Sequence, residues 1–421
     1  MYENSLIYAR QQDERDPLRL FRDKFYIPVK NDRTSIYFCG NSLGLQPKSV
    51  ERYFDIEFEK WQQLAVEGHF QGENPWVSYH YHGKKALAGL LGTKEHEVVI
   101  MNNLTTNLHL LLASFYQPEG KRKKIIIEEG AFPSDHYAVS SHMEQKGVDP
   151  DSDLILIKIP DNGYLSNEKV VDVIRETGEQ LALVMLPGVQ YYTGQYFNMK
   201  KITHAAHEVG ALAGFDLAHA IGNLPMDLHN DKVDFATWCS YKYLNSGPGN
   251  VSGIFIHEKH ANNPDTPKLK GWWGHNEKTR FTMDNNFDPM PGVDSWMLSN
   301  VNVLATSIHL GSLRVFEEAG IDRLREKSVH LTGFLEFLLS ENEILNKSIQ
   351  ILTPSEPEER GCQLSLYFHS KGRKAFEYLS ERSVIMDWRE PNVIRVAPTP
   401  LYNTFEEVYE FVELLSEAMK E

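Results

Sequence analysis

Six short apolar runs alternate with helix-sized segments between residues 124 and 258, and this alternation limits most strongly what the chain can fold into. The runs are KIIIEE, LILIKI, LALVMLPG, GALAGFDLA, VDFATWCSY and SGIFIHE. Strands that alternate with helices along a chain are typical of α/β folds with a mostly parallel sheet. The sequence therefore predicts such a sheet as the centre of the molecule.

The pattern changes beyond about residue 310. An amphipathic stretch, LGSLRVFEEAGIDRLREKSVHLTGFLEFLLSEN, precedes two strand-like runs, QLSLYFH and NVIRVAP. A chain of 421 residues also exceeds what one hydrophobic core usually organises. We predict an N-terminal segment over residues 1–50, a large α/β domain over 51–310 and a smaller C-terminal α+β domain over 311–421.

Residues 48–66 are predicted to form a helix with one apolar face. Its apolar side chains recur at helical spacing and are Phe54, Phe58, Trp61 and Leu64. Such a face packs on a core or on a partner subunit.

Charge and cysteine content exclude several classes of protein. A formal net charge of −15 argues against nucleic-acid and anionic-membrane partners. No apolar run reaches the length of a membrane span, and the N-terminus becomes charged too early for a signal peptide. The three cysteines, Cys39, Cys239 and Cys362, are far apart and form no CxxC pair, so we expect neither a metal site nor a disulfide. A cytoplasmic location is the simplest expectation.

A lysine lies just beyond the strand-like run VDFATWCSY, in CSYKYLNSGPG. A lone lysine at a strand end is most often a surface residue. The alternative is a Schiff-base lysine that holds pyridoxal phosphate. That interpretation requires an acid for the pyridine nitrogen, donors for the phosphate and a group that covers the ring, and each can be sought elsewhere in the chain.

The acid is available in GFDLAHA, where Asp216 ends an apolar run 26 residues before Lys242. This spacing accommodates a crossover and the next strand, so both side chains can emerge at the same edge of the sheet. Asp216 has the alternative role of a helix cap. His219 can lie near the same ring, or it can be an ordinary packed histidine.

Two other segments offer the remaining contacts. Thr105 and Thr106 begin a predicted helix, where free N–H groups favour an anion, although simple N-capping is the alternative. FPSDHYA brings Phe132 close to Asp135; the ring can stack on a cofactor, and the carboxyl can orient one of its substituents. Ordinary loop packing and turn chemistry explain the same residues.

Ten stretches together resemble the kynureninase family, which contains pyridoxal phosphate enzymes of the aspartate aminotransferase fold, fold type I. They run in order from about residue 40 to 403 and are GNSLGLQPK, NLTTNLHLL, FPSDHYA, YYTGQYFNM, GFDLAHAIGN, DFATWCSYKYLNSGPG, GWWGH, RFTMDN, PGVDSWMLSN and NVIRVAPTPLYN. GFDLAHA combined with CSYKYLN is highly specific, whereas GNSLG alone is not.

The resemblance implies roles for particular residues. Lys242 and Tyr241 are the expected catalytic residues. The expected cofactor contacts are Leu104, Thr105, Phe132, Pro133, Ser134, Asp135, Asp216, His219, Tyr241, Lys242, Trp272 and Asn300. Since the family's sites form at the interface of a homodimer, part of this set is expected from the neighbouring subunit. The expected substrate contacts are Arg395 at the α-carboxylate, where a surface arginine is the alternative, and His69, Trp273, His275 and Asn300 around the aromatic ring.

The sequence departs from the family pattern at one position. Some relatives have serine before the glycine of LPGVQYYTG, where it contributes to cofactor binding, and this chain has Pro187. Proline offers neither a hydroxyl nor an N–H, so one hydrogen bond to the cofactor is in doubt.

The expected reaction is hydrolysis of L-kynurenine, and of 3-hydroxy-L-kynurenine, to L-alanine and anthranilate or 3-hydroxyanthranilate in tryptophan catabolism.

Three alternatives stay open. A cysteine desulfurase-like lyase would need an exposed thiol, and Cys362 at the start of a strand-like run is the only late cysteine. A non-catalytic protein that binds pyridoxal phosphate is a second alternative. A nicotinamide enzyme is remote, because no GxGxxG follows the first strand.

Overall fold

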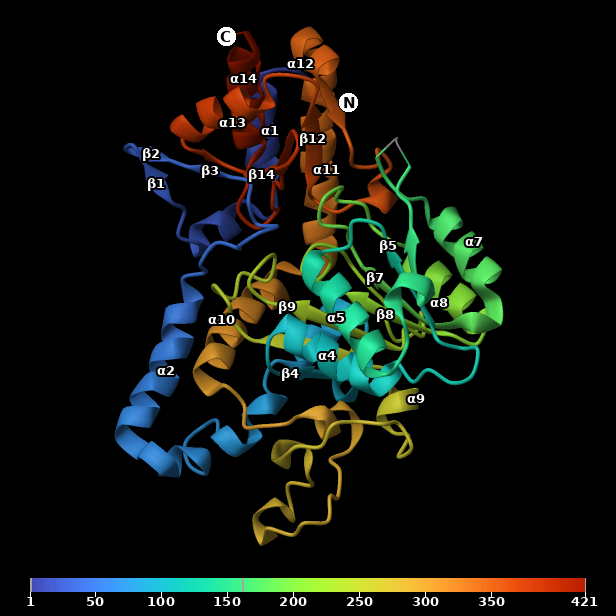
Figure 1. The fold of residues 1–421 in the computed structure, drawn as a ribbon. Coiled ribbons are helices and arrows are strands. Elements are labelled where there is room, and N and C mark those ends of the chain that lie inside the picture. The colour runs from blue at the N-terminus through green and yellow to red at the C-terminus, as the bar shows by residue number, and fades with distance from the viewer. Residues whose placement is uncertain (1, 161–162, 421) are drawn as a thin grey trace.

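The computed structural model describes residues 2–160 and 163–420, and its largest element is a seven-stranded sheet (Figure 1). The order is β4-β10-β9-β8-β7-β5-β6. The strands are β4 (Val98–Ile100), β5 (Lys124–Glu128), β6 (Leu154–Ile157), β7 (Leu181–Pro187), β8 (Leu212–Asp216), β9 (Phe235–Cys239) and β10 (Ser252–Ile256). Five neighbouring strands are parallel, in the order β9, β8, β7, β5 and β6. β10 runs antiparallel to both β9 and β4. The predicted mostly parallel α/β sheet is confirmed.

Helices cover both faces of this sheet because successive side chains of a strand point to opposite sides. In β7, Val184 and Leu186 belong to one apolar cluster, and Leu183 and Met185 belong to another. The first cluster includes side chains of α3 (Lys84–Leu91), α7 (Asn167–Thr177), α8 (Met199–Glu208) and α10 (Val303–Ala319). The second includes side chains of α4 (Leu104–Phe115), α5 (Pro133–Gln145) and α9 (Glu258–Ala261). The short α6 (Pro150–Asp153) precedes β6.

A second sheet lies in the C-terminal part of the chain. It is antiparallel, in the order β11-β12-β15-β14, with β11 (Ile349–Ile351), β12 (Leu364–Phe368), β14 (Asp387–Arg389) and β15 (Val393–Val396). The runs QLSLYFH and NVIRVAP form β12 and β15, as predicted. A third apolar cluster joins this sheet to α11 (Ile321–Glu341), α13 (Gly372–Glu381) and α14 (Phe405–Lys420), and α12 (Glu343–Ser348) follows α11.

The N-terminal segment packs against this C-terminal part, so the two ends of the chain lie together (Figure 1). The Asp13 carboxylate at the end of α1 (Leu6–Arg15) accepts hydrogen bonds from the backbone N–H groups of Phe405 (2.8 Å) and Glu406 (2.9 Å) in α14. β3 (Ile36–Tyr37) pairs with β13 (Val384–Ile385), and β1 (Val29–Lys30) with β2 (Arg33–Thr34).

The helix predicted over residues 48–66 is α2 (Ser49–Leu64), which packs on α10 along one side. Its other side leaves large apolar side chains exposed: Phe58 is 48% exposed and Trp61 is 57% exposed. None of the helices within the described residues is long and apolar enough to cross a membrane.

Candidate active site

A pocket lies at the carboxyl edge of the large sheet, where β5, β7, β8 and β9 end. Because these strands are parallel, the residues that end them meet at one edge. The lining residues are Leu104, Thr105, Glu128, Phe132, Ser134, Asp135, Pro187, Val189, Tyr191, Asp216, Ala218, His219, Tyr241 and Lys242. The structure thus brings nine of the predicted cofactor contacts into one pocket.

Lys242 lies in the turn three residues after β9. Its Nζ is 5.8 Å from the ring centre of Phe132 and 5.9 Å from that of Tyr241, so two aromatic rings flank the lysine. The turn is held by the GNSLG segment, in which the backbone N–H of Gly44 donates to the Tyr241 carbonyl (2.8 Å). A Cβ at Gly44 would lie 2.3 Å from the Lys242 carbonyl oxygen, so only glycine fits there.

Two acidic side chains share the floor of the pocket. Asp216 ends β8, its Oδ1 accepts the Ala218 N–H (2.7 Å), and the residues that follow form a turn rather than a helix, so Asp216 is not a helix cap. Asp135 hydrogen-bonds to Asp216. Burial raises the pKa of both carboxyls, but the charge of Lys242 opposes the rise at Asp216, whereas the charge of Asp216 adds to it at Asp135. Asp135 therefore holds the shared proton and Asp216 carries the charge.

The N-terminus of α4 supplies the second set of donors. Asn103, and neither threonine, is its N-cap: the Asn103 Oδ1 accepts from the Thr106 N–H (3.0 Å). The N-capping alternative for Thr105 is therefore wrong. Leu104 and Thr105 line the pocket in the first turn of the helix, where free N–H groups and the helix dipole favour an anion such as a phosphate. Ser134 reaches the pocket from the first turn of α5.

Unpartnered polar atoms show that the pocket suits a polar aromatic ligand. In the described part of the chain, Glu128 Oε2, Asp135 Oδ1 and His219 Nδ1 are buried without a hydrogen-bond partner. Buried polar atoms normally have partners, so a group of three around one pocket points to a ligand. Burial lowers the pKa of His219, which keeps its imidazole neutral. The lysine suits the aldehyde of pyridoxal phosphate, and the carboxyl suits its pyridine nitrogen. The helix N-terminus suits the phosphate, and the aromatic rings suit the cofactor ring.

Arg395 of β15 lies next to the pocket and is 1% exposed, so the surface alternative for it is wrong. Its Nη1 donates to the Tyr191 carbonyl (2.6 Å), and its Nη2 forms an ion pair with Asp387 on the adjacent strand. Tyr191 lines the pocket, and therefore connects Arg395 to it.

The other predicted contacts do not line this pocket. Pro133 is the first residue of α5, beside Phe132. Trp272 is 42% exposed, and Trp273 is buried under the guanidinium of Arg280, which lies 4.3 Å from the ring centre. His275 is engaged within its own loop, where Nε2 contacts Thr279 Oγ1 (3.0 Å) and Nδ1 accepts from the Asp288 N–H (3.2 Å).

Two further predicted residues also lie apart from the pocket in a single chain. His69 packs edge-on against Trp76, with ring centres 5.2 Å apart. Asn300 is exposed and lines a second cavity together with Asn103 and Thr106, so it lies next to the start of α4. A single copy of the chain therefore brings neither residue into the pocket.

Sequence reasoning did not identify Glu128 and Tyr191 as pocket residues. Glu128 carries the same signal as Asp216, because it is an acid at the end of a buried apolar strand. Tyr191 lies in the YYTG stretch, four residues after β7 ends at Pro187. The ring of Tyr191 stands edge-on to that of Phe132, with the centres 5.3 Å apart.

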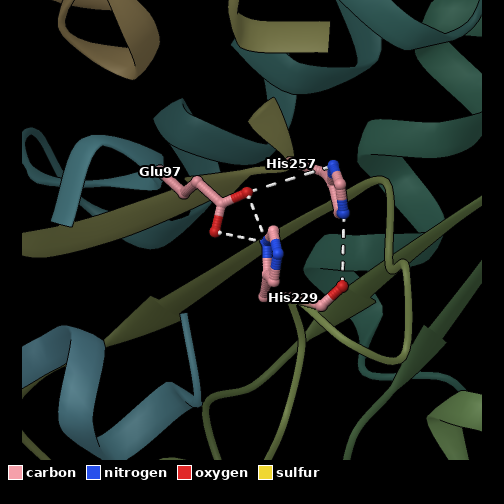
Figure 2. A group of neighbouring side chains, drawn as sticks. All are labelled: Glu97, His229 and His257. Atoms are coloured by element: carbon pink, nitrogen blue, oxygen red, sulfur yellow. Dashed lines mark hydrogen bonds and ion pairs between the residues drawn. The ribbon is translucent and has the colours of Figure 1, made fainter. Parts of the chain in front are cut away.

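A second cluster of ionisable groups lies at the opposite edge of the same sheet (Figure 2). The ligand atoms of Glu97, His229 and His257 lie within 4.8 Å of one another. All three side chains already have protein partners: the Glu97 oxygens accept the N–H groups of Lys94 (2.9 Å) and Glu258 (2.8 Å) and contact His229 Nδ1 (3.0 Å), and His257 Nδ1 accepts the Lys259 N–H (3.2 Å). We interpret this cluster as a set of hydrogen bonds that fixes the loops, and assign no metal to it.

Comparison with known proteins gives the family. Residues 36–347 match the class-V aminotransferase family, and residues 324–415 match the kynureninase C-terminal domain. A kynureninase of Flavobacterium johnsoniae is 48% identical over 420 residues, which covers 99% of each chain. A kynureninase of Xanthomonas oryzae pv. oryzae is 49% identical over 412 residues, which covers 97% of each chain.

Solved structures with the same fold include two cysteine desulfurases. The enzyme from Thermococcus onnurineus has a TM-score of 0.75 at 18% identity and covers 94% of this chain and 96% of its own. The enzyme CsdA from Escherichia coli also has a TM-score of 0.75, at 16% identity, and covers 96% of this chain and 98% of its own. At such low identity they show the fold type alone. The full-length relatives and the two family models establish that this chain belongs to the kynureninase family of pyridoxal phosphate-dependent enzymes.

Proposed function

We propose that the pocket at the carboxyl edge hydrolyses L-kynurenine to anthranilate and L-alanine, and 3-hydroxy-L-kynurenine to 3-hydroxyanthranilate and L-alanine. The observation that carries the proposal is the convergence of Lys242, Asp216 and the N-terminus of α4 on one pocket, in a chain that is about half identical to full-length kynureninases. Pyridoxal phosphate, when bound, supplies an electron sink for bonds broken next to the substrate amine.

The chain's own residues hold the cofactor and move protons. Lys242 would hold the cofactor, and its free amine would take the proton from the substrate Cα. Asp216 would keep a negative charge against the pyridine nitrogen. Burial raises the pKa of Tyr241, which keeps its phenol protonated, so that it can donate a proton near the lysine when the Cβ–Cγ bond of the substrate breaks. Water completes the hydrolysis at the γ-carbonyl.

Arg395 is proposed to bind the substrate α-carboxylate. A guanidinium suits this role because it offers several N–H donors in one plane. The Arg395 Nε is buried without a partner among the described residues, so its N–H is free, while Tyr191 and Asp387 engage Nη1 and Nη2.

The working enzyme is proposed to be a homodimer. The exposed apolar side chains of α2, together with the exposed Trp272 and Phe281 (53%), form surfaces that a second copy would cover. In such a dimer Trp272 and Asn300 complete the cofactor site, and His69, Trp273, His275 and Asn300 surround the substrate ring.

The three cysteines are free thiols, which supports a cytoplasmic location.

The rival cysteine desulfurase activity has little support. Cys362 is fully buried, and burial raises the pKa of its thiol to about 12, so it does not form the thiolate that such a reaction requires. The non-catalytic alternative fits the intact pocket poorly.

The direct test is product formation from L-kynurenine and 3-hydroxy-L-kynurenine, with Lys242→Ala as the blank. Equimolar alanine and anthranilate, or its hydroxylated form, that appear only with Lys242 support the proposal. No alanine from either substrate, with the cofactor bound, would reject it.

A further inference from the structure

Glu128 is a buried carboxyl group of the pocket that the proposed mechanism does not use. It ends β5 and is 2% exposed. Its Oε2 has no hydrogen-bond partner in residues 2–160 and 163–420. The next residue, Glu129, is exposed instead and accepts the Ile159 N–H (3.1 Å). Glu128 is therefore the one of these two acids that the strand directs into the site.

The pocket holds three carboxyl groups and one ammonium group. Glu128, Asp135 and Asp216 lie with Lys242, and the other titratable side chains that line the pocket are His219, Tyr191 and Tyr241. Buried carboxyls this close cannot all be ionised, because like charges repel and burial disfavours each charge.

The environment of Glu128 favours its neutral form. Burial raises the pKa of Glu128 to about 8, and the charge of Asp216 adds to the rise. The backbone N–H of Glu128 and the side chain of Gln190 oppose it only in part. Lys242 favours the charged form of both aspartates, but its charge ranks directly after burial at Asp216 and last among the causes at Asp135.

We propose that Glu128 is a positioning residue of the cofactor site. Its protonated carboxyl confines the negative charge of the pocket floor to Asp216. When pyridoxal phosphate binds at alkaline pH, the carboxylate of Glu128 takes up a proton. The inference rests on the proposed placement of the cofactor in this pocket. Neither the resemblance nor the family comparison assigns this residue.

The proton uptake follows from the shape of the site. A bound cofactor would cover the floor and remove water from it, and an ionised carboxylate there, with its Oε2 unpartnered, would be costly. Binding therefore selects the protonated form, so above pH 8 the affinity for the cofactor falls with pH, by up to about tenfold per unit from this group.

The test measures protons rather than turnover. Pyridoxal phosphate is bound back to the cofactor-free full chain in a calorimeter, in two buffers with different ionisation enthalpies, at pH 7 and pH 9. We expect the wild type to take up about one proton more than Glu128→Gln at pH 9 and the same number at pH 7. Glu129→Gln is the matched control and should behave as the wild type. Glu128→Asp keeps a carboxyl and should keep the uptake.

Equal proton uptake by the wild type and Glu128→Gln at both pH values would overturn the inference. If Glu128→Gln does not fold, infrared spectra of the wild type and of Glu128→Asp at pH 7 test the protonation of Glu128 instead. A protonated-carboxyl band that shifts in Glu128→Asp supports the inference. A band that does not shift overturns it. Alanine formation from L-kynurenine by the wild type and by Glu129→Gln, measured on the same preparations, tests the proposed function separately from the proton uptake.

Discussion

Buried acids lie at both edges of the large sheet, and the two edges surround them differently. At the carboxyl edge, Glu128 and Asp135 each keep an oxygen without a hydrogen-bond partner among the described residues. At the opposite edge, Asp234 precedes β9 and is fully buried, but it contacts His207 (2.8 Å), Lys259 (2.7 Å) and His260 (2.7 Å) and accepts the Ala213 N–H (2.7 Å).

The difference appears in the pKa values of the acids. Burial disfavours the charge of Asp234, but hydrogen bonds from His207 and His260 and the charge of Lys259 outweigh it and lower its pKa. Burial instead dominates at Glu128 and raises its pKa to about 8. Carboxyls with complete protein partners stabilise the fold, whereas those that lack partners mark the edge where a ligand binds.

The largest effect is expected on catalysis at the carboxyl edge. Asp216→Asn should lower kcat/KM for L-kynurenine by about 10³-fold, because an amide cannot hold a negative charge against the pyridine nitrogen. The thermal unfolding midpoint should change little. A variant that retains wild-type kcat/KM would remove Asp216 from the site.

The matching change at the opposite edge is expected to act on stability. Asp234→Ala leaves His207, Lys259 and His260 without their buried partner and should lower the free energy of unfolding by about 3–5 kcal/mol. Because the pKa of Asp234 is depressed in the folded state, this loss is full at pH 7 and shrinks as the pH falls below the unfolded value of about 3.9. Urea unfolding at pH 7 and pH 3 measures it, and a loss that does not depend on pH would contradict the account.

Glu128→Gln should have the opposite effect on the free energy of unfolding and raise it at pH 7. In the unfolded chain Glu128 ionises above about pH 4.3, whereas in the folded chain it stays protonated up to about pH 8, so its carboxyl lowers stability as the pH rises between these values. The amide removes this cost and should raise the free energy of unfolding by roughly 3 kcal/mol at pH 7. The gain should be absent at pH 4. Equal effects at the two pH values would mean that Glu128 does not titrate as proposed.

The smallest effect is expected at Cys362. Cys362→Ala should keep kynurenine hydrolysis within about twofold, because a buried thiol with a pKa of about 12 takes no part in catalysis. An inactive but folded variant would favour the desulfurase alternative.

The sequence predicted the sheet and the centre of the site because both depend on local patterns. The six apolar runs form the five parallel strands and β10, but β4 has only three residues, too few for a recognisable pattern. Lys242 and Asp216 were identifiable because each follows or ends such a run. Glu128 was not, since the sequence does not show which of two adjacent acids points inward.

Residues that depend on distant contacts were harder to place. Arg395 reaches the pocket through the Tyr191 carbonyl, 204 positions away in the sequence. Trp272, Asn300 and His69 lie outside the pocket of one chain, and no local sequence pattern indicates this.

The central claim is that the carboxyl edge of the sheet holds pyridoxal phosphate on Lys242. Borohydride reduction of the holoenzyme fixes the cofactor to its lysine, and peptide mass spectrometry then identifies the labelled residue. The account predicts a single pyridoxyl group, on the peptide that contains Lys242. A label on another lysine, with Lys242 unmodified, would contradict it.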